Sequence, residues 1–282
     1  MGSLVRGKEK NTRDKTLIKR DKELIDSALR EYLSKLKGPS SLLEAMRYTL
    51  FSGGKRLRPI LTVESCRALR GDIEKALPFA CAIELIHNFS LIHDDLPSMD
   101  NDDFRRGRPT CHKRFGEGLA ILAGDGLLNL AFSIISKTKN KRSLEIISLL
   151  SDAVGVENLI GGQVLDLKYK DRLNEGSKTR ARINYMKTAS LMAVSCKIGS
   201  LMAESGGQHV KRMYEFGKNL GCAFQIADDI ADIACDRPSL GEMREKARFS
   251  ISKGKRYLDP LKKKADTLRY IADSIEAKIE TG

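Results

Sequence analysis

Apolar side chains recur at helical spacing along almost the whole chain, and the breaks between the helical runs are short. Pairs such as Gly38-Pro39, Gly53-Gly54 and Gly71-Asp72 separate the first runs, because glycine and proline end helices. No alternation of apolar and polar residues predicts a set of strands, and no repeat has a fixed period. The pattern predicts an all-α, single-domain bundle of long helices over residues 1–282. The expected helices cover residues 16–37, 40–51, 58–70, a run from Gly71-Asp72 to about residue 96, and then 117–137, 142–170, 178–204, 208–235 and 242–280.

Lysine and arginine outnumber aspartate and glutamate by 13, and most of this excess lies at the two ends of the chain. Residues 1–37 and residues 243–282 each hold 11 basic and 6 acidic residues. Solvated faces of terminal helices explain such runs, and a cationic field also attracts polyanionic substrates. Because no zinc-finger or RNP motif accompanies the charge and only 6% of residues are aromatic, we expect no nucleic-acid partner.

Several features favour a cytoplasmic protein without a membrane anchor. No segment approaches 18 uninterrupted apolar residues, so we expect no membrane span. The first 30 residues are charged and lack the apolar stretch of a secretion signal. The six cysteines are scattered, and no CxxC pair indicates a zinc or redox site.

Two acidic clusters interrupt sequence that is otherwise apolar and helical. The first reads His93-Asp94-Asp95-Leu96-Pro97-Ser98-Met99-Asp100, and the second reads Gln225-Ile226-Ala227-Asp228-Asp229-Ile230-Ala231-Asp232. In the second cluster Asp228 and Asp232 are four residues apart, so they project from one helix face. One such cluster alone is more often surface acidity or a helix cap. Two clusters in apolar surroundings favour divalent cations, because crowded buried carboxylates repel each other and Mg²⁺ prefers oxygen ligands.

Basic residues accompany both clusters. The stretch Gly53-Gly54-Lys55-Arg56-Leu57-Arg58-Pro59 places cations and free backbone N–H groups at an expected helix start, which suits an anion. Arg105-Arg106-Gly107 follows the first acidic cluster directly. Either stretch alone is more often a solvated loop than a site. Together with the carboxylates they predict a diphosphate held between metal ions and basic side chains.

The order of these motifs resembles the trans-prenyltransferases of the isoprenoid synthase group, in particular the bacterial farnesyl diphosphate synthases. The resemblance implies a helical bundle around a deep central cavity, a homodimer, and three Mg²⁺ ions per active site. It covers roughly residues 20–240 and includes Gly53–Pro59, Ile86–His112, Leu122–Asp125, Gly161-Gly162-Gln163, Lys187-Thr188 and Gly221–Asp232.

The resemblance also implies roles for individual residues. Asp94 and Asp100 resemble the ligands of two Mg²⁺ ions, and Asp228 resembles the ligand of the third. Asp95, Asp229 and Asp232 resemble further carboxylates of the metal site. The matching positions for the allylic diphosphate are Arg105, Lys187, Thr188 and Gln225, and those for isopentenyl diphosphate are Gly54, Lys55, Arg58, His87 and Arg106. By position alone, His87 is more often a core histidine.

The reaction that the resemblance implies is the condensation of isopentenyl diphosphate with an allylic diphosphate. Metal ions and basic side chains stabilise the negative charge of the departing pyrophosphate, so that the allylic C–O bond ionises. The isopentenyl double bond then attacks the carbocation, and pyrophosphate removes a proton. No side-chain nucleophile is needed, which agrees with the lack of a Ser/His/Asp or Cys/His arrangement in the sequence.

The position of Phe89 predicts the product length. Phe89 lies five residues before Asp94, which places it about 7.5 Å further along the helix axis. An aromatic ring there, beside Ser90 and with Leu96-Pro97 inside the first cluster, resembles the pattern of bacterial farnesyl diphosphate synthases, and this resemblance implies that the ring closes the floor beneath a growing chain. We therefore expect a C15 product, with C20 as the alternative. The competing interpretation is that Phe89 is ordinary core packing.

One departure from the family pattern follows the second acidic cluster. Relatives have a longer segment there, with further lysines, that helps to cover the diphosphates, whereas residues 233–241 lead directly into a terminal helix. We expect the natural protein to carry extra residues between Gly241 and Arg244, and a shortened lid is the alternative. The gap also keeps open a catalytically silent partner subunit. A terpene cyclase is disfavoured, because a cyclase has no second diphosphate to bind.

Overall fold

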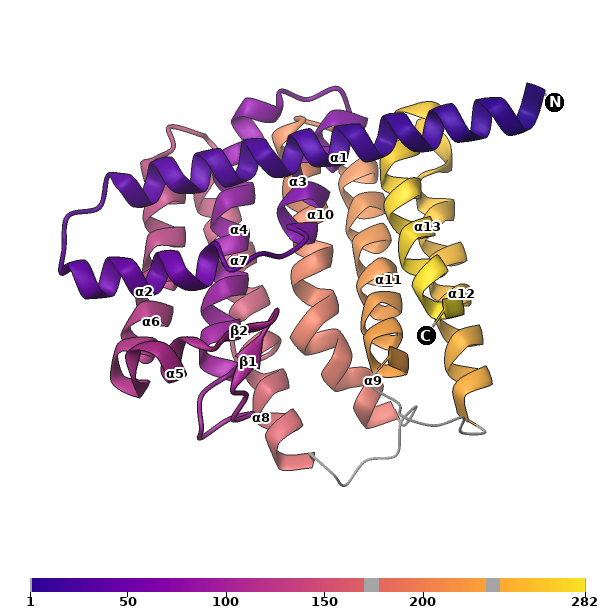
Figure 1. The fold of residues 1–282 in the computed structure, drawn as a ribbon. Coiled ribbons are helices and arrows are strands. Elements are labelled where there is room, and N and C mark those ends of the chain that lie inside the picture. Colours follow the sequence, from indigo (N-terminus) through magenta and orange to yellow (C-terminus); the bar gives the residue numbers. More distant parts are fainter. Residues whose placement is uncertain (1, 170–177, 232–238, 282) are drawn as a thin grey trace.

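The computed structural model of the protein describes residues 2–169, 178–231 and 239–281 (Figure 1). Apart from one small hairpin, every regular element in these ranges is a helix, as the sequence predicts. The first half contains α1 (Gly2–Ser34), α2 (Ser40–Leu50), α3 (Leu57–Ala68), α4 (Ile73–Asp94), β1 (Phe104–Arg105), β2 (Arg108–Pro109), α5 (Cys111–Phe115), α6 (Glu117–Lys137) and α7 (Ser143–Val154). The second half contains α8 (Leu159–Tyr169), α9 (Lys178–Asn184), the π-helical turn η1 (Tyr185–Ala189), α10 (Ser190–Met202), α11 (Gly207–Ala231), α12 (Ser239–Tyr257), the 3₁₀ segment η2 (Asp259–Ala265) and α13 (Asp266–Thr281).

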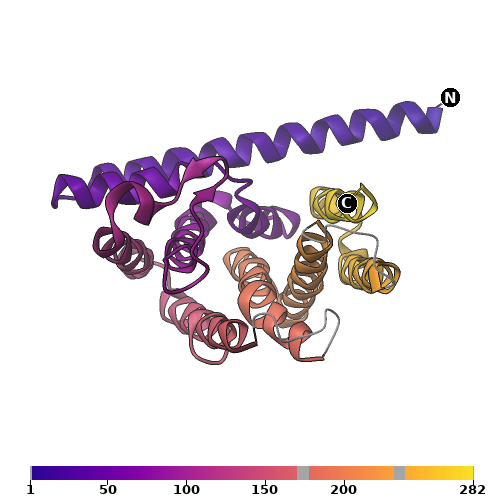
Figure 2. The same cartoon turned by 60° about the horizontal axis from the view of Figure 1, so that its bottom comes forward.

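Helix α4 is the central element of the bundle. Its residues from Phe79 to Ile86 are buried on every side, so this helix has no solvent-facing stripe. It packs against α3, α6 and α10, while the long α1 crosses one end of the bundle (Figures 1 and 2). One continuous cluster of buried apolar side chains joins α1 to α13. The middle of α4 is therefore held by neighbours on all sides, and its carboxyl end is partly exposed at Leu91, His93 and Asp94.

The structure divides two of the expected helices and adds detail to two other segments. The expected helix 142–170 is two helices, because Gly155 takes an extended conformation between α7 and α8. The expected helix 242–280 is broken after α12, where Pro260 begins η2. The run 178–204 is continuous but contains the π-helical turn η1, which carries Lys187 and Thr188. The expected loop after α4 contains the hairpin β1–β2, with Phe104 paired to Pro109.

Two of the described helices, α4 and α6, are long and apolar enough to cross a membrane by length and composition. In α4, 72% of the apolar window is buried inside the protein, which is typical of a core helix. In α6 the buried share is 44%, and Ile121 and Leu122 are exposed. These properties do not make either helix a membrane span.

Candidate active site

The first acidic cluster lies where α4 ends. Asp94 is the last helical residue, and its carbonyl oxygen accepts a hydrogen bond from the Asp100 backbone N–H at 2.9 Å, which curls the segment back on itself. Burial raises the pKa of the Asp94 carboxyl to about 6; Lys187 opposes the rise, and the Asp100 carboxylate adds to it. The curl thus gathers carboxylates whose mutual repulsion favours a bound cation.

Two arginines of the hairpin β1–β2 join this cluster to the Gly53-Gly54 turn. Arg105 donates from Nε to Asp95 Oδ1 at 2.6 Å and from Nη2 to Asp102 Oδ2 at 3.2 Å. Burial raises the pKa of Asp95, although the Arg105 guanidinium counteracts it. Arg106 donates to the Gly53 carbonyl oxygen at 2.6 Å. Asp95 and Arg105 are therefore paired with each other, and Arg106 holds the Gly53-Gly54 turn.

The second acidic cluster lies at the end of α11. Asp229 accepts hydrogen bonds from Asn184 Nδ2 at 2.8 Å and from Gln225 Nε2 at 2.9 Å. Gln225 Oε1 in turn accepts from the Thr188 hydroxyl at 2.7 Å. The pKa of Lys55 is lowered, chiefly by Lys278, and that of Arg58 is lowered by burial; the Asp228 carboxylate opposes the shift in both. The structure thus brings Thr188, Gln225 and Asp229 together, whereas Asp232 lies outside the described residues.

Lys187 links the two clusters. Its ammonium group lies near the Asp94 carboxylate and donates to Asp166 Oδ2 at 2.6 Å, and Arg180 donates to Asp166 Oδ1 at 3.0 Å. Sequence reasoning missed Asp166 as a site residue. The available signal was its position three residues after the Gly161-Gly162-Gln163 motif, one turn along α8. A Cβ on Gly162 would lie 2.8 Å from Met186 Cβ, so this glycine allows α8 to pack directly against η1.

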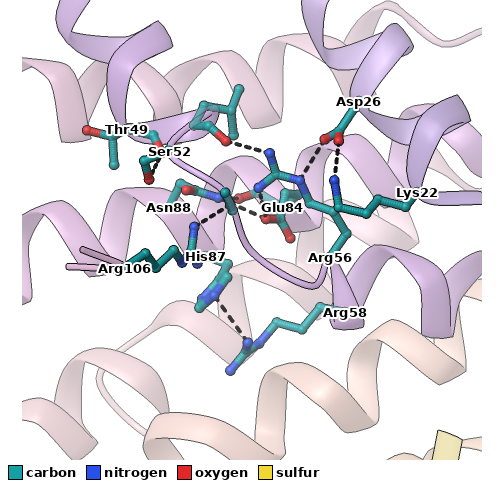
Figure 3. A network of polar contacts seen from close by, with 12 residues as sticks. Lys22, Asp26, Thr49, Ser52, Arg56, Arg58, Glu84, His87, Asn88 and Arg106 are labelled. Atoms are coloured by element: carbon teal, nitrogen blue, oxygen red, sulfur yellow. Dashed lines mark hydrogen bonds and ion pairs between the residues drawn. The ribbon is translucent and has the colours of Figure 1, made fainter. Parts of the chain in front are cut away.

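The Gly53–Pro59 stretch forms the basic side of the site (Figure 3). Arg58 Nη1 lies 3.3 Å from His87 Nε2. Burial, followed by the nearby Arg58, holds the pKa of His87 well below its usual value, so the neutral imidazole accepts from Arg58. Gly54 has φ of +113°, and a Cβ there would lie 2.8 Å from the Arg106 guanidinium. Only glycine fits this position, which leaves the backbone of the turn open.

Lys55 has an unusual neighbour. The Lys278 ammonium of α13 lowers the pKa of Lys55, and burial adds to the effect. Lys55 itself is exposed. A second positive charge so close to Lys55 strengthens the attraction of this side of the site for an anion.

Phe89 lies within α4 on the apolar side of the first cluster. It is buried, and its ring meets the His93 ring edge-on with centroids 4.9 Å apart. His93 Nε2 lies 3.1 Å from the Ile121 carbonyl oxygen, and a Cβ on Gly124 would collide with the imidazole. Ser90 donates to the His87 carbonyl oxygen at 2.9 Å. The phenyl ring is therefore fixed by a histidine that α6 holds in place.

The carboxylates fit a magnesium site that includes the substrate. No three His, Cys, Asp or Glu side chains among the described residues form a ready-made site for one ion. Mg²⁺ usually binds through one or two carboxylates together with waters and substrate phosphates. Burial, and then the neighbouring Asp100 and Asp95, raise the pKa of Asp94, so a nearby cation would stabilise its charged form. Asp94 and Asp100, with Asp228 from the other cluster, are the residues that would hold such ions.

Comparison with known proteins agrees with this arrangement. The family model described as polyprenyl synthetase matches residues 39–246. A farnesyl diphosphate synthase of Geobacillus stearothermophilus is 38% identical over 290 residues, covering 93% of this chain and 96% of the relative. A geranylgeranyl diphosphate synthase of Cyanophora paradoxa is 40% identical, covering 80% of this chain and 77% of the relative.

Solved structures show the same fold. The structure of an FPP/GFPP synthase from Zymomonas mobilis superimposes with a TM-score of 0.87 at 37% identity, covering 94% of this chain and 99% of that one. A geranyltransferase from Legionella pneumophila superimposes with a TM-score of 0.89 at 29% identity, covering 96% and 99%. The chain belongs to the polyprenyl synthetase family and is a chain-elongating prenyltransferase.

Proposed function

We propose that the protein is a farnesyl diphosphate synthase, which condenses isopentenyl diphosphate with dimethylallyl and geranyl diphosphates. The observation that carries this proposal is the link between the two acidic clusters through neighbouring residues. Lys187 lies near Asp94, while the hydroxyl of Thr188 bonds to Gln225 beside Asp229. One diphosphate between the clusters would meet acidic groups on both sides and a lysine between them.

We assign the allylic diphosphate to the space between the two acidic clusters. Lys187 and Arg105 are proposed to contact its oxygens, and Thr188 and Gln225 to orient it. Up to three Mg²⁺ ions, held by Asp94, Asp100 and Asp228 with Asp95, Asp229 and Asp232 in support, would neutralise the departing pyrophosphate. In the ligand-free protein Arg105 and Lys187 are paired with Asp95 and Asp166. These ion pairs orient both cations.

Isopentenyl diphosphate is assigned to the basic side, where Lys55, Arg58 and Arg106 supply positive charge and Gly54 exposes its backbone. The neutral His87 accepts a hydrogen bond from Arg58 and so orients the guanidinium. Asp228 lies near Lys55 and Arg58, which sets this pocket beside the allylic one. The short separation suits attack of one substrate on the other, because reacting groups held close together avoid a large entropy cost.

The proposed product is C15, with C20 as the second candidate. Phe89 supports C15, because the His93 ring and α6 hold it firmly below the first cluster. The relatives support both, since they include farnesyl and geranylgeranyl diphosphate synthases. A Phe89 ring that closes the floor would stop elongation after the second addition.

We also propose that residues 1–282 act as one domain and that the protein is a homodimer. Exposed apolar side chains gather on α6, α7 and α8, which are neighbours in the fold. Such a patch on neighbouring elements is typical of an interface. Its members are Ile121, Leu122, Leu144, Val156, Ile160, Val164 and Leu167. A cytoplasmic location remains a prediction from the sequence.

The test is a product assay. The protein is incubated with isopentenyl diphosphate, each of the C5, C10 and C15 allylic primers and Mg²⁺, and the products are identified by mass spectrometry. We expect farnesyl diphosphate from the C5 and C10 primers and little elongation of the C15 primer. Efficient elongation of the C15 primer would establish the C20 alternative, and a cyclic hydrocarbon or no product would refute the proposal.

A further inference from the structure

Arg56 differs from its neighbours in the Gly53–Pro59 stretch because it points into the protein. Only 3% of its surface is exposed, whereas Lys55 is exposed and Arg58 is partly exposed. Its backbone is left-handed, with φ of 53° and ψ of 35°, at the residue that precedes α3. A left-handed conformation is unfavourable for a residue with a side chain, so surrounding contacts must impose it.

Each nitrogen of the Arg56 guanidinium donates to a different element (Figure 3). Nε donates to Asp26 Oδ1 of α1 at 2.7 Å, Nη1 to Glu84 Oε1 of α4 at 2.7 Å, and Nη2 to the Leu50 carbonyl oxygen of α2 at 2.5 Å. The planar guanidinium supplies three directed bonds at once, which a lysine ammonium cannot reproduce in the same geometry. One side chain thus fixes the turn to three helices.

The two acidic partners of Arg56 depend on it to different degrees. Glu84 is 2% exposed and also accepts from Asn88 Nδ2 at 3.0 Å. Asp26 is shared with Lys22, whose ammonium lies 2.7 Å away. Without Arg56, Glu84 would be a buried carboxylate with no cationic partner among the ion pairs of the described residues, while Asp26 would keep Lys22.

The network lies directly behind the proposed isopentenyl diphosphate pocket. Arg56 stands between Lys55 and Leu57-Arg58, and Glu84 is one helical turn before His87 on α4. From the other side, Arg106 holds the Gly53 carbonyl oxygen. The turn is therefore fixed at two points, Gly53 and Arg56. The pocket residues Gly54 and Lys55 lie between these points, and Arg58 follows them.

We infer that Arg56 is a positioning residue for isopentenyl diphosphate: anchored to Glu84, Asp26 and Leu50, it sets the turn that presents Lys55 and Arg58 to the diphosphate. This inference rests on the proposed function. Arg56 does not touch substrate, because its guanidinium is buried and all three nitrogens are engaged. Its removal raises the KM for isopentenyl diphosphate and leaves the allylic half of the site unchanged.

The decisive variant is Arg56→Met combined with Glu84→Gln, which removes the cation and its buried acidic partner together. Replacing a buried ion pair by neutral groups is often neutral for stability, so the protein is expected to melt near the wild-type temperature. We expect the KM and the calorimetric Kd for isopentenyl diphosphate to rise about tenfold or more, because small displacements of binding groups are costly. The KM for geranyl diphosphate and kcat are expected to stay within about twofold.

The matched control is Arg67→Met with Asp21→Asn. Arg67 lies at the other end of α3 and also joins this helix to α1, through hydrogen bonds to Asp21 at 2.7 and 2.8 Å. Arg67 also pairs with the buried Glu64, which loses its cation in this control, so the control is expected to lower the melting temperature without changing either KM. If the double variant does not fold, Arg56→Lys decides the question, because it keeps the charge but loses the three-way anchoring and still raises the KM for isopentenyl diphosphate selectively.

Two results would overturn the inference while leaving the proposed function intact. One is that the wild-type protein binds isopentenyl diphosphate and the Arg56 variants bind it with the same affinity. The other is a parallel loss of both substrates that follows melting temperature, as expected for a purely structural residue. If the wild-type protein binds no isopentenyl diphosphate in the calorimeter, the proposed function is wrong and the inference falls with it.

Discussion

The two acidic clusters are held in different ways. In the first, the partner of Asp95 is a cation, Arg105, which lies ten residues later in the adjoining hairpin. In the second, Asp229 accepts hydrogen bonds from two neutral amides: Gln225 one turn earlier, and Asn184 from a segment 45 residues away. The donor to Asp95 is thus charged and local in sequence, whereas these two donors to Asp229 are neutral and one of them comes from a distant segment.

This difference bears on how the site keeps its negative charge. Neutral donors such as the amides of Asn184 and Gln225 stabilise a carboxylate without cancelling its charge. In the first cluster, Arg105 compensates Asp95 while the crowded Asp94 keeps a pKa raised to about 6 by burial. The two clusters therefore use different donors to hold a carboxylate in place. Substitutions made in each cluster separately test this difference.

The largest effect is expected from the proposed metal ligands. Asp94→Asn and Asp228→Asn each keep the size of the side chain but remove a charged oxygen ligand. Turnover should fall about a hundredfold or more, since stabilisation of the departing charge is lost. The measurement is kcat at saturating Mg²⁺, with melting temperature as the check on folding. The control Asp152→Asn, on exposed α7, should be silent, and an Asp94 or Asp228 variant as active as this control would remove that residue from the metal site.

A smaller loss is expected from the neutral donors of the second cluster. Asn184→Ala and Gln225→Ala each remove one amide from Asp229 but leave its charge in place. Groups that orient metal ligands typically contribute about tenfold to activity or metal affinity. The apparent Mg²⁺ affinity, measured by titrating activity, should weaken in both variants. The exposed Asn129→Ala of α6 is the control. If neither amide matters, Asp229 has no role that depends on its orientation.

Phe89→Ala should change the product more than the rate. Removing the ring opens the floor below the first cluster, so C20 or longer products should appear while isopentenyl diphosphate consumption falls only modestly. The control is Phe79→Ala, ten residues earlier on the same helix and also buried. That variant should cost about 3–5 kcal/mol of folding stability without lengthening the product. An unchanged product from Phe89→Ala would assign Phe89 to core packing.

The remaining prediction concerns the segment that follows the second cluster, and it is tested by the mass of the protein, not by a rate. The junction between Gly241 and Arg244 lies inside α12, where Leu240 and Met243 are buried. The alignment with the Geobacillus relative is 290 residues long, more than the 282 residues of this chain, so the relative carries residues that this chain lacks. Extra residues at the junction stay a prediction. Intact-protein mass spectrometry should show an excess of a few kDa over 31.4 kDa, whereas a mass near 31.4 kDa means a shortened segment.

The sequence predicted the helical class and the two acidic clusters well, because charged residues stand out in apolar helical sequence. The helix 117–137 has the same bounds as α6. The prediction of single long helices over 142–170 and 242–280 was wrong, because the apolar periodicity continues on both sides of the helix-breaking residues Gly155 and Pro260. Periodicity reports a helix face over many residues and is insensitive to one residue that breaks the backbone.

The supporting residues of the site could not be predicted in the same way. Asp166 and Asn184 are single polar residues in helical segments; the packing of α8 against η1 brings Asp166 to Lys187, and that of α9 against α11 brings Asn184 to Asp229. Arg56 reads as one more cation of a solvated turn, although the structure buries it against Glu84. Their positions depend on contacts between segments that are far apart in the sequence, and no local pattern encodes those contacts.

The most direct test of the account asks whether the two clusters bind one diphosphate together. Binding of a non-ionisable thio analogue of geranyl diphosphate is measured by calorimetry with and without Mg²⁺, in wild type, Asp94→Asn, Asp228→Asn and the double variant. For a shared site we expect each single variant to lose most of the Mg²⁺-dependent affinity and the double variant to lose little more, because residues that act as a unit are not additive. Losses that add up across the two substitutions would mean that the clusters bind independently, which would contradict the account.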